Sequence, residues 1–160
     1  SLLDAGGYEE SFTRYGFEDI ELAYRLTERG MRLVYADEIA TAHRSGNASF
    51  ATHCSRHREA GRMAARFHDL HPGSEASAFL NVDGFRARGR VTPFERLMRL
   101  GFGLVQSAPR ALRPALLNGA AATTFLFGAC VPERVRHVGY HLVRHMFYAD
   151  GLDARTRVRS

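Results

Sequence analysis

An acidic helix start behind a glycine-containing loop constrains the first part of this chain more than any other feature. Three carboxylates, Glu18, Asp19 and Glu21, open a segment in which apolar residues recur at helical spacing as far as Gly30. Acidic side chains are favoured in a first helical turn because the unpaired amide groups and the helix dipole make that end positive. The sequence therefore predicts a helix from about Glu18 to Gly30, preceded by the loop of residues 6–16.

A second group of signals follows this helix. The residues from Met31 to Tyr35 predict a short strand, those from Ala36 to Glu38 predict a turn, and His43 stands a few positions later. Local chemistry alone favours a histidine that ends the strand and bonds to the backbone.

The order of these motifs resembles the family 2 glycosyltransferases. From Ala5 to Arg44 the chain runs Gly-Gly-aromatic-acidic, Gly-aromatic-Glu-Asp-x-Glu-Leu, x-Arg-Leu, Gly, a short strand and a His. This string is similar to the C-terminal half of the nucleotide-sugar transferase domain of that family, and a looser similarity reaches about Pro72. The resemblance implies an α/β fold: a partial GT-A fold, rich in helices, that lacks the N-terminal nucleotide-binding half.

The resemblance also implies roles for individual residues. Asp19 matches the general base that takes a proton from the acceptor hydroxyl, and Glu18 and Glu21 would orient the hydroxyls of the acceptor. The expected acceptor-binding wall consists of Tyr15, Gly16 and Phe17.

His43 matches a histidine that completes a divalent-metal site, for Mn²⁺ or Mg²⁺, in the same family. The other ligands there come from an Asp-x-Asp motif, which this sequence lacks. One neutral histidine cannot hold either ion usefully, because both prefer several oxygen ligands. We therefore expect the remaining ligands and the donor-binding residues to lie in a missing half that precedes Ser1.

Charge and cysteine content limit the classes of partner. The net charge of +5 is carried by Arg, which suits phosphate-bearing or anionic-lipid partners because a guanidinium binds an oxyanion through two bonds. The excess is small and dispersed in the first half, so we do not expect nucleic acid as a partner. Cys54 and Cys130 are far apart without metal-ligand spacing, which indicates free thiols in a cytosolic setting.

The composition along the chain predicts four parts. They are the transferase-like residues 1–72, a loop or linker at 73–92, a helical region at 93–152 and a tail at 153–160. Within the helical region, the uncharged stretch from Leu116 to Val131 is shorter than the roughly 20 residues that span a bilayer, so we expect it to form a buried helix.

The last helical segment, after Pro132, has basic residues opposite an apolar face. Its basic residues are Arg134, His137, His141, Arg144 and His145. A basic amphipathic helix suits the surface of a membrane, and it suits packing on the preceding helices equally well.

Two classes of function stay open. The first is the C-terminal portion of an inverting glycosyltransferase, which uses a nucleotide-sugar donor bound by the missing half and a glycan or lipid-linked acceptor. Such a protein is expected in the cytoplasm, either free or peripheral at the cytoplasmic membrane. The second is a non-catalytic helical module, membrane-associated or interacting with a protein, that retains a relic of the transferase fold.

The absence of a donor half predicts a negative result for the chain by itself. Because no Asp-x-Asp motif is present to recruit a metal and a diphosphate, the 160-residue chain should not bind UDP-sugars, with or without Mn²⁺. Isothermal titration calorimetry tests this expectation. A site of micromolar affinity would show that the chain holds a whole active centre.

Overall fold

The fold is all-α. The computed structural model describes residues 2–32, 34–36, 38–39, 48–73 and 92–153. These residues are 70% helical and contain no strand, so the predicted α/β class with its partial GT-A fold is wrong. The described residues between Met31 and Tyr35 have no regular secondary structure, and Val34 and Tyr35 are exposed. A strand is stabilised by its neighbours in a sheet, and the described segments provide none.

Five α-helices and one 3₁₀ helix make up the described part of the chain. Their bounds are α1 Glu18–Glu28, α2 Phe50–Leu70, α4 Pro93–Ser107, η1 Arg110–Leu112, α5 Arg113–Gly128 and α6 Glu133–Asp153. The predicted helix after the glycine loop is confirmed as α1. Two further helices begin at polar caps: the Ser49 side chain accepts from the Thr52 amide, and Thr92 forms a capping box with Glu95.

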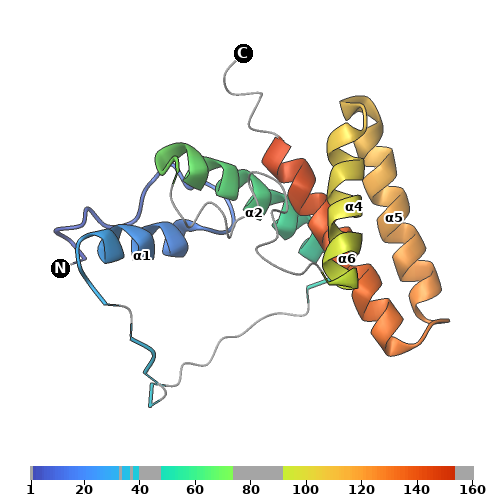
Figure 1. The fold of residues 1–160 in the computed structure, drawn as a ribbon, viewed down its shortest axis with the longest axis horizontal. Coiled ribbons are helices and arrows are strands. Elements are labelled where there is room, and N and C mark those ends of the chain that lie inside the picture. The colour runs from blue at the N-terminus through green and yellow to red at the C-terminus, as the bar shows by residue number, and fades with distance from the viewer. Residues whose placement is uncertain (1, 33, 37, 40–47, 74–91, 154–160) are drawn as a thin grey trace.

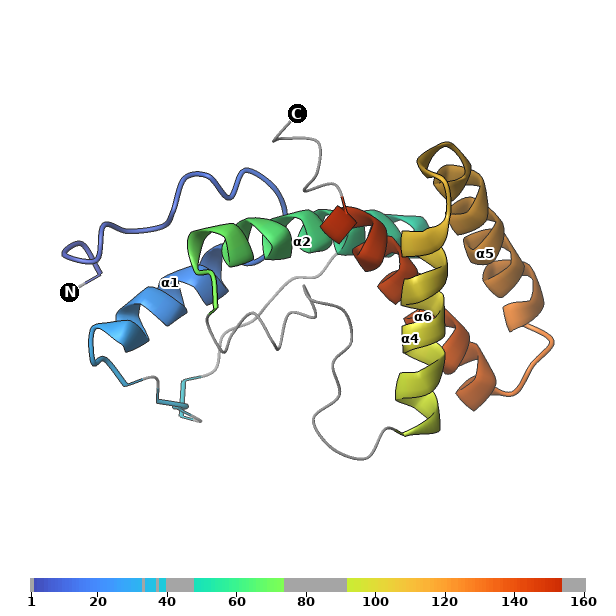
Figure 2. The same ribbon diagram turned by 45° about the horizontal axis from the view of Figure 1, so that its top comes forward.

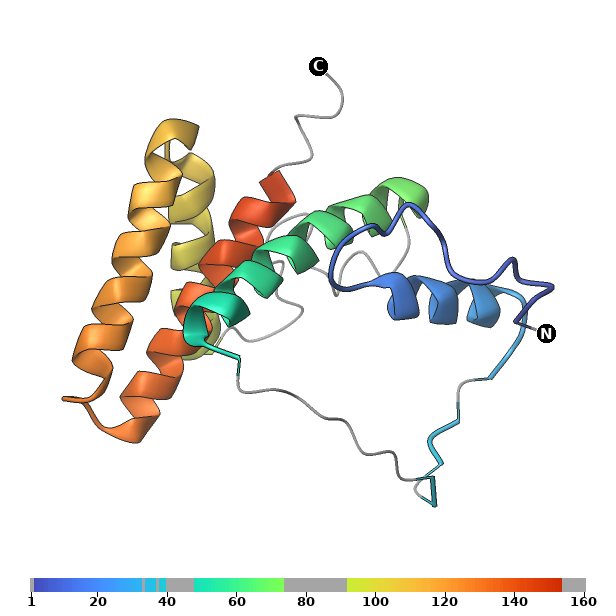
Figure 3. The same cartoon turned by 180° about the vertical axis from the view of Figure 1, so that it is seen from behind.

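Helix α2 is the long connection between two ends of the molecule. The N-terminal loop and α1 lie at one end of it, and α4, α5 and α6 gather at the other (Figures 1 and 2). Helix α5 runs antiparallel to α6, because Gly128 at its end faces Arg136 while Arg113 at its start pairs with Asp153. The same arrangement is seen from behind in Figure 3.

The main core lies where α2, α4 and α5 pack on α6. Its buried members are Cys54, Ala64, Ala65, Phe102, Val105, Leu117, Val143, Met146, Phe147, Ala149 and Leu152. Cys54 and Cys130 are both free thiols, as expected. Burial raises the pKa of the Cys54 thiol, whereas Cys130 is exposed.

Two glycines allow α2 and α6 to touch backbone to backbone. A Cβ added to Gly61 would lie 2.2 Å from the carbonyl oxygen of Tyr148, and one added to Gly151 would lie 2.0 Å from that of Arg58. Any larger residue at either position would push the helices apart. The two helices run in the same direction, since the Phe50 ring contacts Tyr140 and the Gly61 contact lies further along both helices.

Helix α5 departs from the sequence-based expectation. The stretch from Leu116 to Val131 was expected to be buried, yet most of α5 is exposed, and its buried residues are Arg113, Leu117 and Gly128. One narrow side of α5 packs on α6, and small residues such as Ala120 and Ala121 line part of this contact. Within the described residues, no helix combines the length and the apolar character needed to cross a bilayer.

The boundary predicted at 73–92 is not tested, because residues 74–91 are not described. Helix α2, on one side of that interval, shares the core with α6 on the other side.

Replacing Gly61 tests the helix crossing. Gly61→Ala should lower the free energy of unfolding by about 1–3 kcal/mol, because its methyl group meets a backbone carbonyl that cannot rotate away. Gly119→Ala in α5 is the matched control: nothing lies near its Cβ position, so it should stabilise by about 0.5–1 kcal/mol. Urea unfolding measures both. Equal effects of the two variants would contradict the close crossing.

Candidate functional site

The predicted site residues lie where the N-terminal loop turns into α1. The turn needs an unusual backbone: Gly16 has φ +99° and Phe17, the residue before α1, has φ +75°. Among the described residues Phe17 is the only non-glycine with a positive φ, a conformation that costs about 1–3 kcal/mol. Packing of the Phe17 ring against the main core holds it there.

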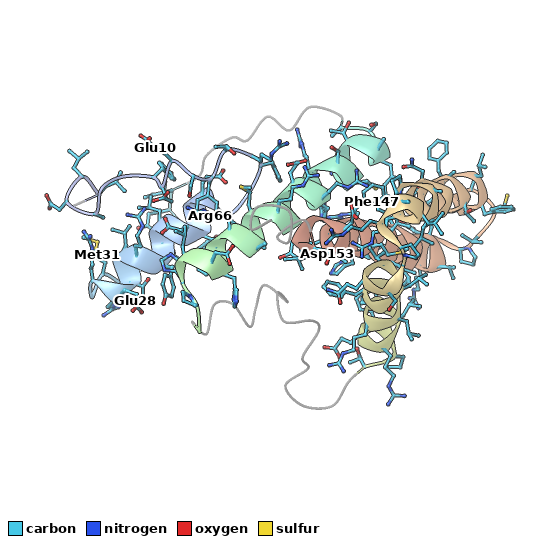
Figure 4. All side chains as sticks on the ribbon, turned by 90° about the horizontal axis from the view of Figure 1, so that it is seen from above. Glu10, Glu28, Met31, Arg66, Phe147 and Asp153 are labelled. Atoms are coloured by element: carbon cyan, nitrogen blue, oxygen red, sulfur yellow. The ribbon has the colours of Figure 1, made fainter. Side chains whose placement is uncertain are left out.

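Polar contacts fix the same loop along α2. The Arg66 side chain donates to the Ser11 hydroxyl at 2.9 Å, and Arg14 pairs with Glu59 at 3.1 Å. Figure 4 shows Arg66 on α2, facing the N-terminal segment. The loop is therefore attached to α2 before α1 begins.

Tyr15 supplies the exposed aromatic surface of the site. The Arg56 guanidinium lies 5.4 Å from the centre of its ring, in a cation–π contact. The neighbouring Gly16 lies close to α2, since a Cβ on it would be 3.4 Å from that of Ala60. Tyr15 is thus held on one side and open to solvent on the other.

The three carboxylates of the first turn of α1 have different surroundings. Asp19 is exposed, accepts the Ile20 amide at 2.8 Å, and forms no ion pair within the described residues. Glu18 is half-buried, and its Oε2 atom is buried with no hydrogen-bond partner. Glu21 is only 1% exposed.

Glu21 is enclosed by two partners. The Arg25 Nε donates to its two oxygens at 2.7 and 2.9 Å, and the His71 Nε2 lies 3.0 Å from Oε1. Tyr24 covers this group, with its ring against those of Phe67 and His71. Glu21 therefore faces the contact between α1 and the end of α2, not the solvent.

Arg25 extends this network to the loop. Its guanidinium donates to the carbonyl oxygens of Ala5 and, at 2.6 Å, of Gly7. The hydrogen bonds that Arg25 donates to the Glu21 carboxylate raise the pKa of the guanidinium, which keeps this side chain charged. Arg25 and His71 were not singled out from the sequence, although the i,i+4 spacing of Glu21 and Arg25 was visible there.

The structure places the predicted residues in two groups. Tyr15, Gly16, Phe17, Glu18 and Asp19 are consecutive and lie in the turn beside α2, whereas Glu21 is buried between α1 and the end of α2. His43 lies outside the described residues. The described ranges contain no group of three His, Cys, Asp or Glu side chains that could hold a metal ion.

Comparison of the chain with family models, with curated proteins and with solved structures found no match. The resemblance to glycosyltransferases thus depends on the residue string from Ala5 to Arg44.

The contrast between Glu21 and Asp19 predicts different effects on stability. Glu21→Gln should lower the free energy of unfolding by about 1.5–3 kcal/mol, because it removes a charged acceptor from Arg25 and His71 in a buried position. Asp19→Asn should change it by less than about 1 kcal/mol, since an exposed first-turn acid contributes only through the helix dipole. Urea unfolding of both variants at pH 7 is the measurement. Equal losses of unfolding free energy would contradict a buried Glu21 and an exposed Asp19.

Proposed function

We propose that this chain is the acceptor side of an inverting glycosyltransferase of family 2, with Asp19 as the general base. One observation carries the proposal: the Asp19 carboxylate is exposed and forms no ion pair with the described residues, whereas Glu21, two positions along the same helix, is buried and bonded to Arg25 and His71. A base must keep its lone pairs available for the substrate. Asp19 also occupies the position in the residue string where the family has its base.

In the proposed reaction, Asp19 accepts the proton of an acceptor hydroxyl. The hydroxyl oxygen then forms a bond to the anomeric carbon of the donor sugar, while the bond from that carbon to the phosphate oxygen breaks. The nucleotide diphosphate leaves with the electron pair of that bond, and the anomeric configuration inverts because attack and departure occur on opposite faces. The exposed ring of Tyr15 offers a flat surface on which an acceptor sugar can stack.

Glu18 and Glu21 have different parts in this proposal. Glu18 is adjacent to Asp19 and only half-buried, so we assign it the orientation of an acceptor hydroxyl beside the base. Glu21 is a positioning residue, because its bonds to Arg25 and His71 fix α1 against α2 and so fix the orientation of the first turn. The strained backbone at Phe17 supports the same interpretation, since strain of this kind clusters at functional sites.

The donor side of the proposal lies outside the described residues. The nucleotide-sugar and a divalent metal, Mn²⁺ or Mg²⁺, would be held by the donor half of a transferase domain, with His43 as one metal ligand. No step assigned to Asp19 passes through the metal. We place the reaction in the cytoplasm, with a glycan or lipid-linked acceptor.

A second candidate is a non-catalytic helical interaction module. The all-α core favours it, because α2, α4, α5 and α6 supply the buried cluster while the predicted catalytic turn lies at its edge. Loss of activity on replacing Asp19 would exclude this candidate.

The test is the initial rate of sugar transfer by a form of the protein that carries the donor-binding segment. Asp19→Asn keeps the size of the side chain but removes the base, so the rate should fall by about 10² to 10⁴. Glu28→Gln is the control: it removes an exposed carboxylate from the other end of the same helix and should leave the rate unchanged. Thermal melts establish that both variants are folded. Near-normal turnover of Asp19→Asn would overturn the assignment of the base.

A further inference from the structure

The end of α5 and the turn into α6 form an exposed apolar surface. Phe125, Leu126 and Phe127 are 65%, 68% and 63% exposed, Cys130 in the turn is exposed, and Val135 in the first turn of α6 is 55% exposed. These five residues are called the apolar tip. The turn between α5 and α6, around which these residues lie, is at the opposite end of the molecule from α1 (Figures 1 and 3).

The geometry of the apolar tip argues against a single flat protein partner. Consecutive residues of an α-helix project about 100° apart, so Phe125, Leu126 and Phe127 point in three directions around α5. A rigid surface could cover one or two of these side chains but not all three. Fluid acyl chains can surround a helix end from several sides at once.

The charges around the apolar tip match an anionic surface. No Asp or Glu occurs between Glu95 and Glu133. Arg134, the second residue of α6, is exposed and forms no ion pair within the described residues, and Arg96 on α4 is also exposed. The start of α4 lies at the same end of the bundle as the turn (Figure 1). The acid nearest to the turn, Glu133, is in the first turn of α6, where the helix dipole favours a negative charge.

The basic face of α6 that the sequence suggested as a membrane contact is partly occupied. The Arg144 Nε donates to the His57 Nε2 of α2 at 3.0 Å, so this cation is directed into the helix contact. Burial lowers the pKa of His145, which keeps this side chain neutral at pH 7. Arg134 is the member of that face which lies next to the apolar tip.

We propose that the apolar tip inserts into the interfacial region of a lipid bilayer that contains anionic lipids, with Arg134 at the level of the headgroups. Apolar side chains beside arginines, on a segment too short to span, are typical of shallow insertion. The proposal is independent of the glycosyltransferase activity, because binding to protein-free vesicles needs neither donor nor acceptor.

A single tryptophan reports insertion directly, since the chain has none. Phe127→Trp should shift its emission to shorter wavelength with phosphatidylcholine vesicles that contain about 30% phosphatidylglycerol. Lipids brominated on the acyl chains should quench it. Leu3→Trp, an exposed position near the opposite end of the molecule, is the control and should do neither. Emission of Phe127→Trp that does not change with vesicles would overturn the proposal.

Vesicle flotation separates the apolar and the charged contributions. Phe125→Ser with Phe127→Ser should reduce partitioning by more than about tenfold, because binding scales with the apolar area that enters the lipid. Arg134→Gln should reduce it about fivefold on anionic vesicles and hardly at all on neutral ones. Leu3→Ser should bind like the unchanged chain. Since all of these side chains are exposed, the fold should survive, and circular dichroism checks it.

Two results would contradict the proposal. One is equal flotation of the double serine variant and the unchanged chain. The other is a lack of vesicle binding together with a dimer in analytical ultracentrifugation that the double serine variant abolishes, because the apolar tip would then be a contact between two copies of the chain.

Discussion

The close crossing of α2 and α6 at Gly61 and Gly151 is the contact on which the rest of the structure depends. A side chain larger than that of glycine at either position would keep the two backbones from meeting. This contact brings α2 into the core that α6 forms with α4 and α5. Because α2 is longer than this contact, its C-terminal end extends beyond the core (Figure 2). The N-terminal loop lies along α2, and α1 packs against its C-terminal end.

The candidate site depends on the extension of α2 through a second, polar set of contacts. Glu21, Arg25 and His71 join α1, the loop and the end of α2, and Phe17 reaches back to the main core. A buried carboxylate is stable only when its oxygens are bonded. By enclosing Glu21, these contacts leave Asp19 as the exposed carboxylate of the first turn. The first turn of α1 therefore carries one buried carboxylate, Glu21, and one exposed carboxylate, Asp19.

At the other end, α5 is exposed because its contact with α6 consists mainly of small residues. Leu117 is buried in the core, but Ala120, Ala121 and Gly128 make up most of the rest of the contact, and Phe125, Leu126 and Phe127 remain exposed. Apolar periodicity is weak in this helix, since almost every residue is apolar or small. The sequence could therefore not indicate which side would be buried, and the expectation of a buried helix was wrong for that reason.

Local signals in the sequence determined the helices but not their assembly. The acids of α1, the caps at Ser49 and Thr92 and the prolines at the starts of α4 and α6 act within one turn of the chain, so they could be recognised without a tertiary structure. A strand at Met31–Tyr35 could not be decided in this way, because its stability depends on a partner elsewhere in the chain. The different environments of Glu21 and Asp19 were also decided by the tertiary structure: they are two residues apart in one helix, and only the position of α2 makes one buried and the other exposed.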